Sequence, residues 1–162
     1  MHNHSNSTLI LALGNDIMGD DGVGLVAGRI LHQEFGDELD YIEAAVGGID
    51  LIEDFSGYEH VILLDAIATG NAPAGTIYEL SRSDFENVSA PSPHATGLAE
   101  ALQLARELAI PVPEEFVVLA IKIDSIPELK VGLGEIIQEA LPAYLQKART
   151  ILREWAKPVF AE

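Results

Sequence analysis

Three side chains in the sequence, two carboxylates and one imidazole, have the chemistry and the spacing to hold a divalent metal ion. Asp16 follows the apolar run 8–13, and Asp65 lies near the end of the apolar run 60–67. His94 precedes a segment of helical periodicity. Taken singly, an Asp after a strand usually shapes a turn or caps a helix, and a lone His is often an exposed loop residue. Two neighbouring carboxylates, however, repel each other unless a cation lies between them.

Short apolar runs alternate with segments of helical period, which predicts an α/β domain with a mostly parallel sheet. The predicted strands are 8–13, 41–46, 60–67, 76–80 and 115–123. The predicted helices cover 23–31, 49–55, 98–108 and 133–155, with a kink at Pro142 in the last.

The connection 68–75 contains two glycines and a proline and has no room for a crossover helix. Parallel neighbours need a crossover of a dozen or more residues, so the fourth strand should run antiparallel to its neighbour. The polar, proline-containing segment 81–93 is predicted to be the one long loop, and loops of this length are usually functional or disordered.

These elements would bring the three candidate ligands together. In an open wound sheet, ligands bind outside the carboxyl ends of the strands. If the strand order begins 2-1-3, Asp16 and Asp65 face one crevice, and the helix that follows His94 begins near the same edge. Two carboxylates and an imidazole leave coordination positions open, but they do not select one divalent ion. His32 and His60 lie away from this crevice.

The glycines around Asp16 predict a tight turn from strand to helix. They match neither a P-loop nor the dinucleotide-binding fingerprint. We expect Asp20 and Asp21 to cap the following helix, because carboxylates are favoured at a helix N-terminus.

The bulk composition limits the partners. The 162 residues are 48% hydrophobic and 22% charged, which suits a single globular domain over 1–162 with a disordered tail over 1–7. The net charge of −17 argues against nucleic acid and anionic membranes. Without cysteine, any metal site must use oxygen and nitrogen ligands. The polar N-terminus has no signal-peptide core, so we expect a cytoplasmic protein, and a monomer.

The run 11–24, which reads Leu-Ala-Leu-Gly-Asn-Asp-Ile-Met-Gly-Asp-Asp-Gly-Val-Gly, resembles the opening signature of hydrogenase maturation endopeptidases. Asp65-Ala66 and the run 92–98 resemble the second and third motifs of this family, in order, within a resemblance that covers about 8–155. The resemblance implies a three-layer α/β/α sandwich, phosphorylase/hydrolase-like, with one antiparallel strand. It also places the metal ligands and the catalytic site at Asp16, Asp65 and His94.

The same resemblance implies a function. Family members cut a C-terminal extension from the large-subunit precursor of a nickel-iron hydrogenase after nickel insertion, as aspartic-type endopeptidases. The substrate's nickel would be the recognised metal, and cadmium or zinc could occupy the same ligands. This chain differs at two points: Asp16 stands where Glu is familiar, and 44–48 reads Ala-Ala-Val-Gly-Gly where many members have a Thr before the glycines. The second difference concerns the substrate peptide rather than the metal ligands.

Two other functions suit the same residues. A self-contained metal-dependent peptidase or amidohydrolase would keep its own divalent ion. A phospho-acceptor receiver domain would also have an acidic pair after its first strand, an Asp ending its third and a lysine such as Lys122 on its last. The short link before the antiparallel fourth strand argues against the receiver domain.

Overall fold

The structure is a computed structural model that describes residues 4, 6–45, 47–87, 93–124 and 129–157. Its centre is a five-stranded sheet in the order β2-β1-β3-β5-β4. The strands are β1 (Thr8–Leu13), β2 (Asp40–Ala44), β3 (His60–Ile67), β4 (Ile77–Ser81) and β5 (Glu115–Lys122). Each lies within two residues of its predicted run, and the order begins 2-1-3 as the site prediction requires.

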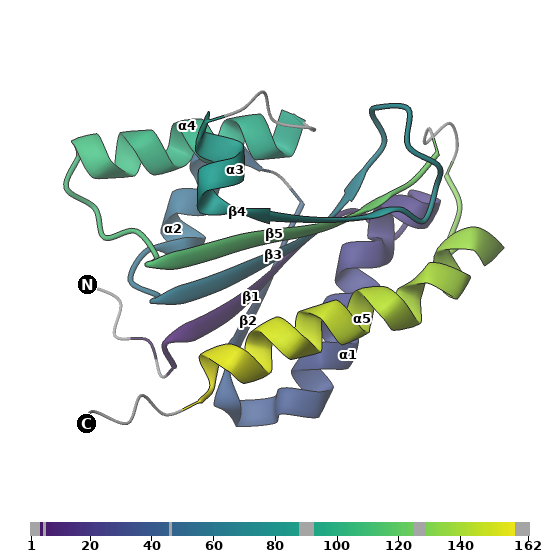
Figure 1. Cartoon of the computed structure of the whole chain (residues 1–162), viewed down its shortest axis with the longest axis horizontal. Coiled ribbons are helices and arrows are strands. Elements are labelled where there is room, and N and C mark those ends of the chain that lie inside the picture. The colour runs from purple at the N-terminus through teal and green to yellow at the C-terminus, as the bar shows by residue number, and fades with distance from the viewer. Residues whose placement is uncertain (1–3, 5, 46, 88–92, 125–128, 158–162) are drawn as a thin grey trace.

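Helices cover both faces of the sheet and make a three-layer sandwich (Figure 1). On one face lie α2 (Leu51–Phe55), the short α3 (Arg82–Asn87) and α4 (Pro93–Glu107). On the other lie α1 (Val23–Phe35) and α5 (Glu135–Trp155). The described residues also include three short 3-10 helices: η1 (Gly19–Gly22), η2 (Gly36–Glu38) and η3 (Gly48–Asp50).

The core is split by the sheet into two apolar layers. Alternate residues of each central strand face opposite layers, as the pleat requires. On β3, Leu63 contributes to the layer under α2 and α4, and Leu64 contributes to the layer under α1 and α5. All central strands are buried on both faces, which explains why they read as near-continuous apolar runs.

The antiparallel strand is confirmed. β4 pairs antiparallel with β5, while the other three pairings of the sheet are parallel. The connection from β3 crosses the position of β5 to reach the sheet edge, so β4 is a neighbour of β5 and not of β3. A receiver domain has an all-parallel sheet in a different order, and the topology therefore excludes that alternative.

One segment differs from the sequence-based expectations. The segment expected as one long loop, 81–93, contains α3, and its residues 88–92 lie outside the described residues. In the N-terminal segment, the ring of His4 stacks on Tyr58 at 3.8 Å and bonds to the Ser56 carbonyl oxygen. Asn6 donates to Asp40 at 2.8 Å. The disordered tail expected for 1–7 stays a prediction.

The last helix runs through Pro142 as one element, and the kink expected there stays a prediction. Among the described residues, no helix has both the length and the apolar character needed to cross a lipid bilayer.

Candidate functional site

The loop after β1 makes the tight turn that its glycines predict. Gly14 adopts φ +147°, and a Cβ at this position would lie 2.3 Å from the Asp21 carbonyl oxygen. The backbone N–H of Asn15 donates to Asp21 Oδ2 at 3.0 Å, and the Asn15 side chain accepts from the Ile17 N–H at 3.2 Å. These contacts fix the backbone on both sides of Asp16.

Asp16 itself is exposed and paired with a cation. Its side chain is 52% accessible, and its Oδ2 lies 3.2 Å from Arg29 Nη2 on α1. Arg29 also donates to both carboxylate oxygens of Glu43 on β2, from Nε at 2.7 Å and from Nη2 at 3.1 Å. Tyr41 donates to the same Glu43 carboxylate at 2.7 Å. The hydrogen bonds from Arg29 hold the pKa of Glu43 below its usual range.

Asp65 has the opposite surroundings. It is only 1% exposed, and it shares its face of the sheet with Leu63 and Ile67, on the side covered by α2 and α4. Its Oδ1 accepts the N–H of Ala66 at 2.8 Å. β3 lies parallel to β1, with Ala12 beside Leu64, so Asp65 and the Asp16 loop lie at one edge of the sheet.

The start of α4 reaches this same edge. The helix leads through 108–114 into the amino end of β5, so its N-terminal turn, with His94 as the second residue, lies toward the carboxyl ends of the strands. Gly97 packs on Gly48, because a Cβ at Gly97 would lie 3.0 Å from the Gly48 Cα. Gly48 belongs to the loop that follows β2. The His94 side chain lies outside the described residues.

The structure therefore brings the three predicted residues to one edge by their backbones. The carboxylate of Asp16 points to Arg29, and that of Asp65 faces the α4 side. Among the described side chains, no three histidine, aspartate or glutamate groups are close enough to hold a metal ion together. His32 stacks on Tyr41 and His60 stacks on Trp155, away from this edge, as expected.

The prediction that Asp20 and Asp21 cap α1 is wrong. Both lie in η1, but neither η1 nor α1 has a side-chain cap. Asp21 accepts from Asn15, as described above, and Asp20 Oδ1 accepts the N–H of Gly134 at 2.7 Å. Asp21 instead stabilises the loop that carries Asp16, and Asp20 links this region to the start of α5. Their acceptor oxygens are bonded to backbone N–H groups outside η1 and α1.

Two further residues at this edge were not predicted as part of the metal site, although Lys122 was considered as the lysine of a receiver domain. Arg29 is one, and no local pattern marks it, since its contacts depend on the packing of α1 beside β2. Lys122 is the other: it is 5% exposed and donates from Nζ to the carbonyl oxygens of Ile123 at 2.7 Å and Ala68 at 3.3 Å. Lysine is almost never fully buried without partners, so its place at the end of a buried strand could have marked it.

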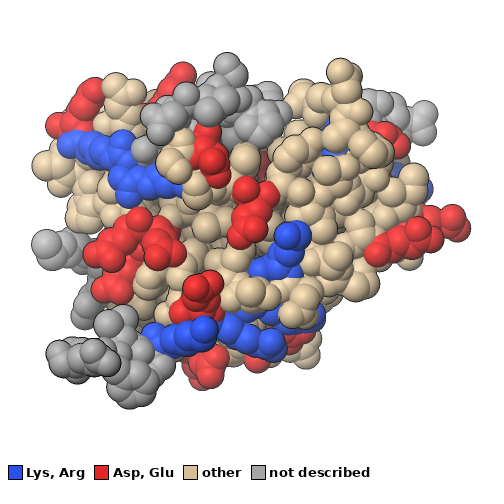
Figure 2. All heavy atoms as spheres, in the orientation of Figure 1, with Lys and Arg blue, Asp and Glu red and all other residues tan. Residues whose placement is uncertain are grey.

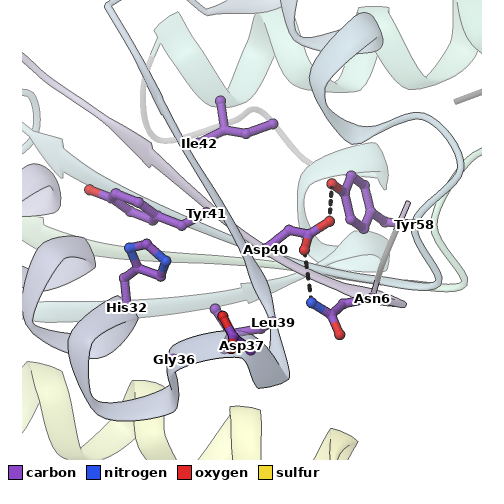
Figure 3. Close-up of a pocket in the computed structure, with 9 residues that line it drawn as sticks. All are labelled: Asn6, His32, Gly36, Asp37, Leu39, Asp40, Tyr41, Ile42 and Tyr58. Atoms are coloured by element: carbon purple, nitrogen blue, oxygen red, sulfur yellow. Dashed lines mark hydrogen bonds between the residues drawn. The ribbon is translucent and has the colours of Figure 1, made fainter. Parts of the chain in front are cut away.

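A cavity of about 520 Å³ lies elsewhere, along the edge strand β2 and near its amino end (Figure 3). Asp40 lies within it and accepts from Asn6 at 2.8 Å and from Tyr58 at 2.7 Å. Neither Asp16 nor Asp65 lines this cavity, and of the two aspartates that do, Asp37 and Asp40, the second is hydrogen-bonded by the protein's own side chains. It is not part of the candidate site.

The fold and this edge define the class of protein: a three-layer α/β/α protein with a mixed sheet and acidic residues at the carboxyl ends of β1 and β3. A family model described as "Hydrogenase maturation protease" matches residues 27–151, which include Asp65 and His94 but not Asp16. The hydrogenase 2 maturation protease of Escherichia coli is 26% identical over 152 residues, which cover 90% of each chain. Protein FrxA of Pyrococcus furiosus is 30% identical over 142 residues, covering 85% of this chain and 98% of that protein.

Solved structures give the same answer. The hydrogenase maturating endopeptidase HybD from E. coli superposes with a TM-score of 0.79 over 92% of this chain and 93% of that one, and at 24% identity it shows the fold alone. The [NiFe] hydrogenase maturation protease HybD from Thermococcus kodakarensis has a TM-score of 0.70 at 28% identity, over 89% and 97% of the two chains. The chain belongs to the hydrogenase maturation protease family, and it is therefore a peptidase.

Proposed function

We propose that the protein is an endopeptidase that removes the C-terminal extension of a nickel-iron hydrogenase large-subunit precursor after nickel insertion. Asp16, Asp65 and His94 bind the nickel that the precursor already carries. The observation that carries this proposal is the meeting of the Asp16 loop, Asp65 and the first turn of α4 at one edge of the sheet. The names of the relatives, which are hydrogenase maturation proteases, support the substrate.

The donor set suits a metal that is held by another protein. Two carboxylates and one imidazole are oxygen and nitrogen ligands that nickel accepts, and three donors leave coordination positions for the substrate's own ligands. The proposed role of the three residues is to dock the precursor at this edge and so place its scissile bond.

Each residue would contribute differently. Asp65 is buried, so its charge is poorly screened by water and attracts a nearby cation strongly. Asp16 lies on a loop fixed by hydrogen bonds, and its exposed carboxylate is accessible to a large partner. His94 stands at the start of a helix whose position is set by the contact of Gly97 with Gly48. It would bind in its neutral form.

The experiment mixes the purified protein with nickel-loaded and nickel-free precursor and follows the C-terminal fragment by mass. We expect cleavage of the nickel-loaded form alone, and its loss in Asp16→Ala, Asp65→Ala and His94→Ala. His32→Ala is the matched control, because His32 is an exposed histidine that contacts Tyr41 and lies away from the edge.

Three results would contradict the proposal. Efficient cleavage of nickel-free precursor without added metal would indicate an ordinary peptidase. Normal processing by any of the three alanine variants would remove that residue from the site. Stoichiometric, tightly held zinc in the freshly purified protein would favour the self-contained metallopeptidase.

A further inference from the structure

The Asp16 carboxylate has a cation as its partner, and that cation is itself firmly anchored. Arg29 makes two hydrogen bonds to Glu43, at 2.7 and 3.1 Å, and a longer one of 3.2 Å to Asp16. Tyr41 anchors Glu43 in turn. A guanidinium group is protonated at all working pH values, so Arg29 keeps its charge. Arg29 is therefore a permanent cation that contacts one oxygen of Asp16.

The surroundings make such a cation significant. The chain carries a net charge of −17, and the carboxyl edge holds Asp16, Asp20, Asp21, Glu43 and Asp65. The face in Figure 2 shows acidic side chains spread widely between a few basic groups. Divalent cations free in solution are concentrated by negative potential of this kind. A free ion bound at the edge would compete with nickel held by a substrate.

We propose that Arg29 is a resident counter-cation for Asp16, which weakens the capture of free divalent cations at this edge and so favours metal already held by the substrate. This inference rests on the proposed function, because it needs Asp16 as a metal ligand. Arg29 acts through Asp16 and is a positioning and selectivity residue, not a catalytic one.

The positive charge of Arg29, rather than its influence on the orientation of Asp16, decides whether its removal strengthens or weakens cation binding. An exposed ion pair contributes little to holding a carboxylate in one place, since water and salt screen it. The fixed positive charge remains a few ångströms from any metal bound by Asp16, and it repels that metal in every rotamer of the aspartate. Removing the charge should therefore strengthen the binding of free cations, although the hydrogen bond to Asp16 is lost.

The variants follow from this argument. Arg29→Gln should bind Cd²⁺ more tightly, by on the order of tenfold at low salt, which is the effect of one unit charge on a divalent ion about 5 Å away in a water-exposed setting. Arg29→Lys keeps the charge and should remain near the parent protein. Glu43→Gln removes the group that partly neutralises Arg29 and should weaken Cd²⁺ binding. The gain in Arg29→Gln should shrink as salt rises.

The experiment is calorimetric titration of Cd²⁺ into the full-length parent protein and these variants at low and high salt. Arg149→Gln is the matched control: it breaks another arginine–glutamate pair, between Arg149 on α5 and Glu34 at the last turn of α1, at 2.6 Å. It should leave Cd²⁺ affinity unchanged. In the processing assay, Arg29→Gln should be inhibited by lower concentrations of added Cd²⁺ than the parent protein.

The outcomes separate this inference from the proposed function. Weaker or unchanged Cd²⁺ binding in Arg29→Gln, with binding lost in Asp16→Asn, would overturn the role of Arg29 and leave the metal site in place. Undiminished binding in Asp16→Asn would remove Asp16 from the site and overturn both. Equal tightening by Arg29→Gln and Arg149→Gln would indicate a general charge effect and would also overturn the inference.

Discussion

At the scale of single residues, Asp16 and Asp65 lie at one edge of the sheet but have different surroundings. Asp16 follows one predicted strand and Asp65 lies near the end of another, and the parallel pairing of β1 with β3 brings both residues to that edge. The side chain of Asp16 is 52% exposed, whereas Asp65 is 1% exposed. This difference was not predictable, because both are aspartates at the ends of apolar runs. Arg29 reaches Asp16 only because α1 packs beside β2, a tertiary contact that no local pattern contains.

A buried tyrosine below the sheet gives a prediction at this scale. Tyr144 donates its hydroxyl to the Leu119 carbonyl oxygen at 2.6 Å, and Tyr144→Phe should cost about 1 kcal/mol of unfolding free energy by losing this bond. Burial, and then the charge of Asp65, raises the pKa of Tyr144 well above its usual value. Above about pH 10 the unfolded chain releases this proton while the native chain keeps it, so stability falls as pH rises.

Urea unfolding at neutral and at alkaline pH tests both effects. The parent protein should lose stability on going to alkaline pH, and Tyr144→Phe should lose less. Tyr78→Phe, on β4, controls for the removal of a hydroxyl elsewhere. An alkaline loss of the same size in Tyr144→Phe would contradict the assignment.

At the scale of elements, all five strands were predictable from apolar runs, and β4 was predictable as antiparallel from the short link before it. The partner of β4 was not, because pairing across the sheet depends on where β5 inserts. The helix α3 was missed although its start carries a signal: Ser81 and Asp84 have capping-box spacing. In the structure the Ser81 N–H donates to Asp84 Oδ2 at 2.7 Å. The polar composition of 81–93 outweighed that signal in the prediction.

The start of α1 gives a prediction at this scale. A Cβ at Gly24 would lie 2.6 Å from the carbonyl oxygens of both Leu13 and Leu64, which belong to the backbone of β1 and β3. Gly24→Ala should push α1 away from the sheet and lower the unfolding free energy by roughly 1 to 3 kcal/mol. Gly134→Ala is a comparison variant at another helix start: the three atoms nearest to its Cβ would belong to the Asp20 side chain, the nearest at 3.6 Å, so it loses chiefly the preference of a helix N-cap for Gly over Ala. A urea midpoint for Gly24→Ala no lower than that of the parent protein would show that the start of α1 adapts without cost.

At the scale of the whole molecule, the protein keeps its family's fold with little sequence identity. The sheet order and the two apolar layers need only apolar residues at the right spacing, which many sequences supply. The loops and helix starts at the carboxyl edge are more demanding, because Gly14, Gly24 and Gly97 each stand where a side chain would meet another backbone. These segments carry the motifs by which the sequence resembles the family, and this is why the motifs indicate the family from the sequence alone.

The net charge of −17 gives the prediction for the molecule as a whole. Self-repulsion of excess negative charge destabilises a compact chain, and salt screens it over about 8 Å at physiological ionic strength. Screening also weakens exposed pairs such as Arg29 with Glu43, but exposed ion pairs in general contribute little to stability. Repulsion among the excess acidic groups should therefore dominate.

Raising sodium chloride from about 20 to about 300 mM should raise the Tm by a few degrees, the shift that about 1 kcal/mol produces in a chain of this size. The rise, measured by calorimetry, should shrink as the pH falls toward the isoelectric point. A Tm that falls with salt at neutral pH would mean that the ion pairs outweigh the repulsion.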